Sequence, residues 1–156
     1  LVAQLISVIF LLGLTCLTSC DRNRLFEKYK SVEDHEWFYQ DTMKYQVEVR
    51  DTTGLYHLYV NMRNKANYPY RNIWLNIAKI APDGATTAYK KEFKLADKKG
   101  KWKGQGLGDV YDHRFPTRKK LKFEQAGEYE FRVNHLMRRD TLPGIMDVGV
   151  RVEKVR

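Results

Sequence analysis

The chain has 156 residues, with 28 Lys and Arg against 19 Asp and Glu, which gives a formal net charge of +9. The only cysteines are Cys16 and Cys20, so a framework of several disulfides is excluded and the fold must be stabilised by packing. No charged residue precedes Cys20, and the whole positive charge therefore belongs to the segment after it. That segment has the size of one domain with a single core.

The N-terminal residues 1–19 have the pattern of an export signal. Residues 1–14 are uncharged and almost entirely apolar, and they lead into the sequence LTSC at 17–20, which resembles a lipobox. A membrane-spanning helix needs about 20 apolar residues, whereas this run is shorter and is followed at once by charged residues. We therefore expect cleavage before Cys20, with diacylglycerol and an N-acyl chain on that residue. Because a basic n-region and an initial Met are both missing, we expect the natural chain to start further upstream.

Residues 20–41 are polar with scattered aromatics and are interpreted as the lipidated Cys and a tether, in which only residues 25–39 could hold a helix. From residue 42 the pattern has period 2, as in strands with one buried face. Residues 42–50 and 55–63 alternate in this way around Gly54, which predicts an antiparallel hairpin. The sequence thus predicts a β-domain over residues 42–156.

Further strands follow along the chain. Residues 72–81 have apolar side chains on both faces, Trp74 among them, which predicts a central strand covered on two sides. Residues 86–95 indicate a more exposed strand, and residues 96–108 indicate a loop. Residues 129–137 and 145–155 again alternate. The motif Ala126-Gly127-x-Tyr129-x-Phe131 resembles the tyrosine corner of immunoglobulin-like folds. We predict a single antiparallel, immunoglobulin-like β-sandwich.

No motif in the sequence favours an enzyme. The four histidines fall in four separate segments without the spacing of a zinc site. Asp109, Asp112 and His113 lie close together, but a turn and strand explain them better than a calcium or catalytic site. The only serine after Cys20 is Ser31, in the expected tether, and the Gly-rich segment 104–108 is not followed by a helix that would hold phosphate. We expect neither a metal nor a catalytic residue.

Two basic runs flank that Gly-rich segment and form the candidate ligand or partner surface. Charge runs are usually solvated faces, but Trp102 within the first run keeps an anionic ligand open as an alternative, since aromatic rings and cations together can bind sugars or lipid headgroups. Export makes nucleic acid an unavailable partner, which leaves anionic envelope glycolipid, phospholipid or an acidic protein. The candidate residues are Trp102, Lys99, Lys101 and Lys103 in the first run, and Arg118, Lys119 and Lys120 in the second.

The chain after residue 19 resembles the gliding motility lipoprotein GldH family of the Bacteroidota. The resemblance rests on Cys20-Asp21-Arg22, on residues 59–64 with 68–75, on the Gly-rich segment up to Asp109, and on residues 127–138. It implies a non-enzymatic envelope lipoprotein linked to the gliding apparatus and the type IX secretion system, expected at the outer membrane and facing the periplasm. Two alternatives stay open, a carbohydrate- or glycolipid-binding module that stacks sugars on Trp102 or Trp37, and, less favoured, an envelope enzyme.

Overall fold

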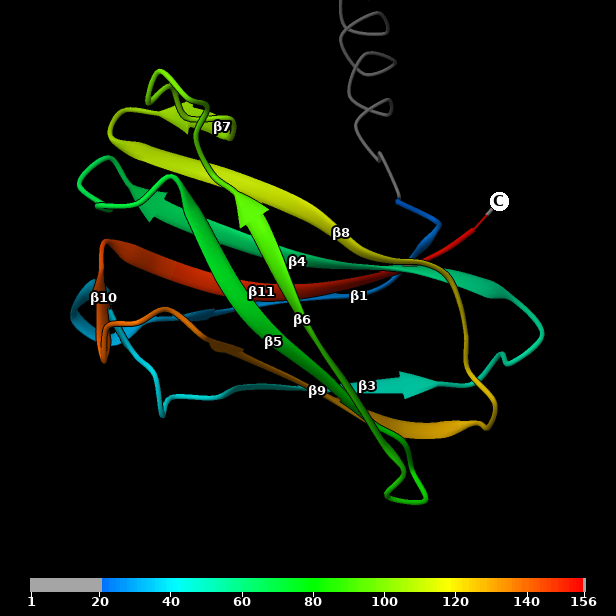
Figure 1. The fold of residues 1–156 in the computed structure, drawn as a ribbon. Helices are drawn as coiled ribbons and strands as arrows, with labels where there is room; N and C mark the ends of the chain where they lie inside the picture. Colours follow the sequence, from blue (N-terminus) through cyan, green and yellow to red (C-terminus); the bar gives the residue numbers. More distant parts are fainter. Residues whose placement is uncertain (1–20, 156) are drawn as a thin grey trace, which may run out of the picture.

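The computed structural model describes residues 21–155. Two antiparallel sheets pack face to face, as Figure 1 shows. The signal peptide predicted over 1–19 and the predicted lipid site Cys20 lie outside the described residues. Within them, no helix is long and apolar enough to cross a membrane.

The larger sheet has the strand order β1-β11-β4-β8-β7, and the smaller has the order β3-β9-β5-β6. A third pair, β10 and β2, closes one end of the sandwich beside the short 3-10 helix η1. The bounds are β1 Arg24–Ser31, η1 Glu33–His35, β2 Glu36–Phe38, β3 Met43–Val49, β4 Leu55–Lys65, β5 Asn72–Ile80, β6 Thr86–Lys94, β7 Gln105–Leu107, β8 Val110–Lys122, β9 Gly127–His135, β10 Thr141–Pro143 and β11 Ile145–Lys154.

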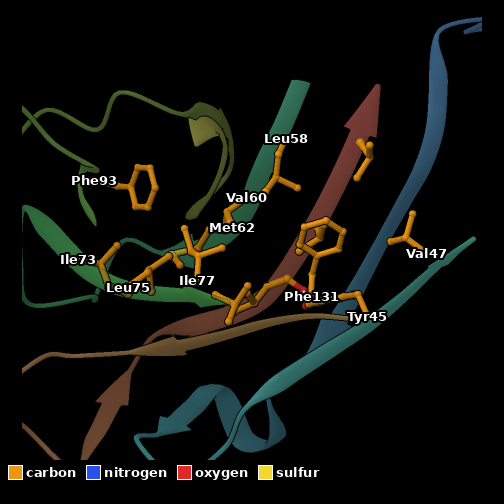
Figure 2. Close-up of a cluster of buried hydrophobic side chains, with 14 of the residues drawn as sticks. Tyr45, Val47, Leu58, Val60, Met62, Ile73, Leu75, Ile77, Phe93 and Phe131 are labelled. Atoms are coloured by element: carbon orange, nitrogen blue, oxygen red, sulfur yellow. Dashed lines mark hydrogen bonds between the residues drawn. The ribbon is translucent and has the colours of Figure 1, made fainter. Parts of the chain in front are cut away.

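The core lies between the two sheets and is built from alternate residues of each strand (Figure 2). β4 contributes Leu58, Val60 and Met62 from the larger sheet, and these face β5 and β9 of the smaller sheet. The hydroxyl of Tyr45 on β3 crosses the core and donates a hydrogen bond of 2.6 Å to the carbonyl of Val148 on β11. This polar contact ties the two layers to each other through the interior.

The all-β antiparallel sandwich predicted from the sequence is confirmed, and the tyrosine corner has the expected geometry. The Tyr129 hydroxyl donates a 3.0 Å hydrogen bond to the carbonyl of Gln125, four residues upstream. Phe131, two residues later, is fully buried. Trp74 differs from expectation, because β5 is interior to its sheet but its outer face is open and Trp74 is 42% exposed. The tryptophan in the core is Trp37, on β2.

The predicted hairpin of residues 42–50 with 55–63 is wrong. β3 pairs with β9 in the smaller sheet, whereas β4 pairs with β11 and β8 in the larger one. The segment between them crosses from one layer to the other. Alternation indicates only that one face of each strand is buried. Two such strands can bury these faces as neighbours in one sheet or by packing against each other from opposite sheets of a sandwich.

The predicted tether over 20–41 is also wrong for most of its length. β1 begins at Arg24 and pairs with β11 along its whole course, and β2 begins at Glu36. β1 is an edge strand whose outward face holds Glu27 and Tyr29, so its polar composition resembles that of a solvated segment. Edge strands commonly carry charges, which limit pairing with other chains.

Candidate binding surfaces

An apolar patch covers part of the outer face of the smaller sheet, where β5 lies beside the end of β9. Trp74 is 42% exposed and Leu136 is 38% exposed, and the backbone N–H of Leu136 donates a 2.8 Å hydrogen bond to the carbonyl of Trp74. Met137 packs beside them, its sulfur accepting a bond from the Trp74 N–H at 3.3 Å. With Tyr70, Arg138 and Arg139, these residues line a hollow of about 400 Å³. We call the set Tyr70, Trp74, Leu136 and Met137 the Trp74 patch.

The outer face of the larger sheet is covered by paired charges instead. Arg151 of β11 is 4% exposed and binds three carboxylates, from Asp21 at 2.5 Å, Glu27 at 2.6 Å and Glu153 at 2.7 Å. Glu27 also accepts hydrogen bonds from Arg114 at 2.9 Å and from Asn61 at 2.7 Å. This cluster joins β1, β11, β4 and β8 across the sheet.

The pairing sets the protonation states of the cluster. The hydrogen bond from Arg151 is the main reason that the pKa of Asp21 lies below its usual range. Burial alone would raise the pKa of Glu27, but the bonds from Arg151 and Asn61 outweigh it and hold this pKa below the usual range as well. The carboxylates are therefore ionised at neutral pH and are engaged with arginines of the same face.

A second hollow, of about 660 Å³, lies beside the first half of β8. Lys94, Lys103 and Arg114 contribute positive charge to its lining and Asp112 a negative one, and the buried His113 lines it as well. The His113 Nε2 is 2.9 Å from the Oδ1 of Asn64, and burial lowers the pKa of His113 to about 4. At neutral pH the ring is uncharged, and its N–H donates to the Asn64 oxygen.

Trp102 lies close to this hollow but is not a free stacking platform. Its ring stacks on Tyr111 with centroids 5.4 Å apart, and it also touches Tyr68 with centroids 6.5 Å apart. One of its faces is thus taken up by the protein itself. Trp37, the other candidate for a sugar platform, is fully buried against His135 and cannot contact a ligand.

The two basic runs of the candidate surface are not brought together. Lys99, Lys101 and Lys103 lie in the segment before β7, which pairs with the start of β8. Arg118, Lys119 and Lys120 lie near the other end of β8, about 20 Å or more away along the strand. They form two separate surfaces at opposite ends of the sandwich.

Asp109, Asp112 and His113 do not converge on a catalytic site. Successive residues of a strand point to opposite faces, so Asp112 lies on the outer face and pairs with Arg63 at 3.0 Å, while His113 points inward to Asn64. Asp109 precedes β8 and is exposed. Among residues 21–155, no group of three or more His, Cys, Asp or Glu side chains is arranged to hold a metal ion.

Comparison with known proteins identifies the family. The family model described as GldH lipoprotein matches residues 24–152. The chain belongs to the GldH lipoprotein family. A gliding motility lipoprotein GldH homolog of Christiangramia forsetii is 31% identical over 94% of this chain and 93% of its own length. The gliding motility lipoprotein GldH of Flavobacterium johnsoniae is 33% identical over 95% of this chain and 96% of its own length. The protein is therefore a gliding motility lipoprotein of the cell envelope.

Among solved structures, a glucuronidase with specificity for decorated arabinogalactans superposes on 91% of this chain and 19% of its own, with a TM-score of 0.46 and 12% identity. This likeness says nothing about function. The GldH motifs quoted from the sequence have mostly structural positions here. Asn64 holds His113, Tyr129 forms the tyrosine corner, and His135 lies buried against Trp37.

Sequence reasoning missed the Trp74 patch and the Arg151 cluster. The pattern of strand 129–137 did contain a signal for the patch, because the apolar pair Leu136-Met137 is followed directly by Arg138-Arg139. The Arg151 cluster left no such signal, since its members come from positions far apart in the chain and alternate with core residues in their own strands.

Proposed function

We propose that this lipoprotein is a non-enzymatic structural or interaction component of the gliding motility machinery and the associated type IX secretion system. The observation that supports this most strongly is the Trp74 patch. Single exposed apolar residues are ordinary, but a contiguous group beside arginines is typical of surfaces that bind other proteins. Tryptophan, tyrosine and arginine are also the residue types that contribute most to binding energy at such interfaces.

The chemistry of the patch favours a partner with an apolar anchor and an acidic rim. Arg138 and Arg139 line the hollow, both are exposed, and neither has a carboxylate partner within residues 21–155. The protein as a whole has a net charge of +9, which accelerates encounter with acidic surfaces. An apolar side chain of the partner would fill the hollow between Trp74 and Leu136, while its carboxylates would meet the two arginines.

We propose in addition that Cys20 carries the diacylglycerol and N-acyl lipids, and that the protein is held at the outer membrane facing the periplasm. The lipobox at 17–20 and membership in a lipoprotein family support the lipid anchor. Several acyl chains on one residue give stable anchoring, whereas a single short chain gives only marginal binding. The anchor would keep the Trp74 patch within reach of partners in the same envelope layer.

The test is capture of the tagged full-length lipoprotein from its native envelope, with mass spectrometry of its partners and of its N-terminal peptide. We expect motility or secretion components to co-purify, and a lipid-modified Cys20 at the start of the processed chain. The paired change Trp74→Ala with Leu136→Ser should remove those components. Leu107→Ser is the matched control, because Leu107 is an apolar residue that is 87% exposed at a distant site. Retention of the same partners by the patch variant would refute the proposal.

A second candidate function is binding of carbohydrate or anionic glycolipid, and the hollow beside β8 favours it. Its volume of about 660 Å³ suits a small ligand, and Lys94, Lys103 and Arg114 would face negative groups on that ligand. Envelope glycolipid should bind the wild-type protein and bind Lys94→Glu with Lys103→Glu at least tenfold more weakly. Lys44→Glu with Lys90→Glu, at two exposed lysines of β3 and β6 that do not line the hollow, makes the same change of net charge and serves as the control. Equal losses in both variants would show that the hollow is not a specific site.

A further inference from the structure

The described chain begins with a residue that is fixed to the body of the domain. The Asp21 carboxylate binds Arg151 at 2.5 Å, and its carbonyl accepts a 3.1 Å hydrogen bond from the N–H of Arg24, the first residue of β1. Asp21 is bonded covalently to Cys20, and consecutive Cα atoms are about 3.8 Å apart. If Cys20 bears the lipid, β1 therefore starts at most about 15 Å from the anchor, where a 21-residue tether would have allowed about 70 Å.

Strand register shows which part of the sandwich lies beside that attachment point. Arg24 is opposite Glu153 at the end of β11, and Lys154 donates its N–H to the carbonyl of Asn23 at 2.7 Å. The start of β4 and the end of β8 complete this end, because Lys154 is opposite Tyr56, and Leu55 is opposite Lys122. Figure 1 shows these segments gathered near the C-terminus. We call this the anchored end.

Basic and apolar side chains are exposed at the anchored end. Its carboxylates are largely engaged, Asp21 and Glu153 by Arg151 and Asp51 by Lys154. Among residues 21–155, by contrast, Arg22, Lys119 and Lys120 have no carboxylate partner. Two leucines, Leu25 and Leu55, are each 39% exposed there. The exposed cations are Arg22, Arg24, Lys119, Lys120, Lys122 and Lys154.

The backbone at the end of β8 is shaped so that it presents part of this charge. The pairing of β4 with β8 shifts register on both sides of Leu58, and Lys120 has a φ of +55°, which a non-glycine residue rarely adopts. The Lys120 N–H bonds to the ring Nδ1 of His57 at 3.3 Å in place of a regular strand partner. Irregularities of this kind redirect side chains, and here they leave Lys119 and Lys120 exposed.

We propose that the anchored end is a membrane-contact surface, on which Arg22, Lys119 and Lys120 bind anionic lipid headgroups while Leu25 and Leu55 rest against the interface. The inference depends on the lipid anchor at Cys20 proposed above. Attraction between exposed charges and an anionic surface falls off within about 10 Å at 0.1 M salt, so a short connection is needed for it to act. Such contact would orient the sandwich, with β7 and the Lys99–Lys103 segment at the end pointing away from the membrane.

The test uses the full-length lipidated protein, reconstituted into vesicles of phosphatidylcholine and phosphatidylglycerol in which a fraction of the lipids has a nitroxide on the headgroup. A fluorophore is attached to Leu55→Cys at the anchored end or, as the matched position, to Leu107→Cys. β8 separates these positions by twelve residues, about 40 Å. We expect several-fold stronger quenching at position 55 than at 107.

Charge variants then test the contact itself. Lys119→Glu with Lys120→Glu should lower the ratio of quenching at position 55 to quenching at position 107, as should vesicles of phosphatidylcholine alone. Lys99→Glu with Lys101→Glu, the same change of charge at the far end, should leave the ratio unchanged. Equal quenching at both positions of the vesicle-bound wild type, or a ratio insensitive to charge, would overturn the membrane-contact surface and leave the anchor intact. Failure of the protein to stay with the vesicles would overturn the anchor and this inference with it.

Discussion

The buried His113 makes the stability of the sandwich depend on pH in a definite direction. Burial lowers its pKa from the ordinary 6.5 to about 4 in the folded protein, while the unfolded chain keeps the ordinary value. Between these two pH values the unfolded state binds a proton that the folded state does not. Stability is therefore fully present above pH 6.5, falls as the pH decreases toward 4, and loses about 3 kcal/mol in total through this residue.

The measurement is urea unfolding of the wild type and of His113→Gln between pH 7.5 and pH 4. Glutamine cannot be protonated and can still donate a hydrogen bond to Asn64. Between pH 7.5 and pH 4, the unfolding free energy of the wild type should therefore decrease by about 3 kcal/mol more than that of the variant. The comparison cancels the contributions of other groups, including His135, whose pKa is also lowered by burial. Parallel pH profiles for the two proteins would show that His113 is protonated in the folded state and refute the reasoning.

Other variants test the remaining contacts. Tyr45→Phe removes the hydroxyl that joins the two sheets and leaves the Val148 carbonyl without this donor, so we expect a loss of about 1 to 3 kcal/mol of unfolding free energy in urea titration. Tyr129→Phe, which breaks the tyrosine corner, should cost about 1 kcal/mol, and an unchanged midpoint would contradict its structural role. Lys120→Gly should relieve positive-φ strain and raise the thermal midpoint, whereas Lys119→Gly should lower it; equal effects would count against the strain.

The sequence predicted the fold class because most of the alternation in β3, β4, β9 and β11 survives in the structure as buried and exposed faces. The strands that the sequence does not predict are those in which the alternation of apolar and polar residues is hidden. β8 has the polar residues His113 and Thr117 on its inward face, so that face does not appear apolar in the sequence. The sequence of β1 predicts a tether, because the ion pairs made by its charged outward face leave no local pattern.

The binding surfaces were less accessible to prediction than the fold. The apolar side chains on both faces of residues 72–81 predict a strand covered on two sides, yet the outer face is open and Trp74 is 42% exposed. The two basic runs lie close in sequence and far apart in space, since the long strand β8 carries the second run to the other end of the molecule. Their separation gives them different proposed roles, one facing a ligand and the other facing the membrane.

We propose above that this GldH-family lipoprotein docks an envelope partner on the Trp74 patch. The most direct measurement places a photoactivatable amino acid at position 136 in cells and identifies the crosslinked protein by mass spectrometry, with position 107 as the reference site. We expect a discrete adduct with a motility or secretion component at position 136 that is absent at 107. The same adducts at both positions, or none at 136 in cells with a working apparatus, would contradict it.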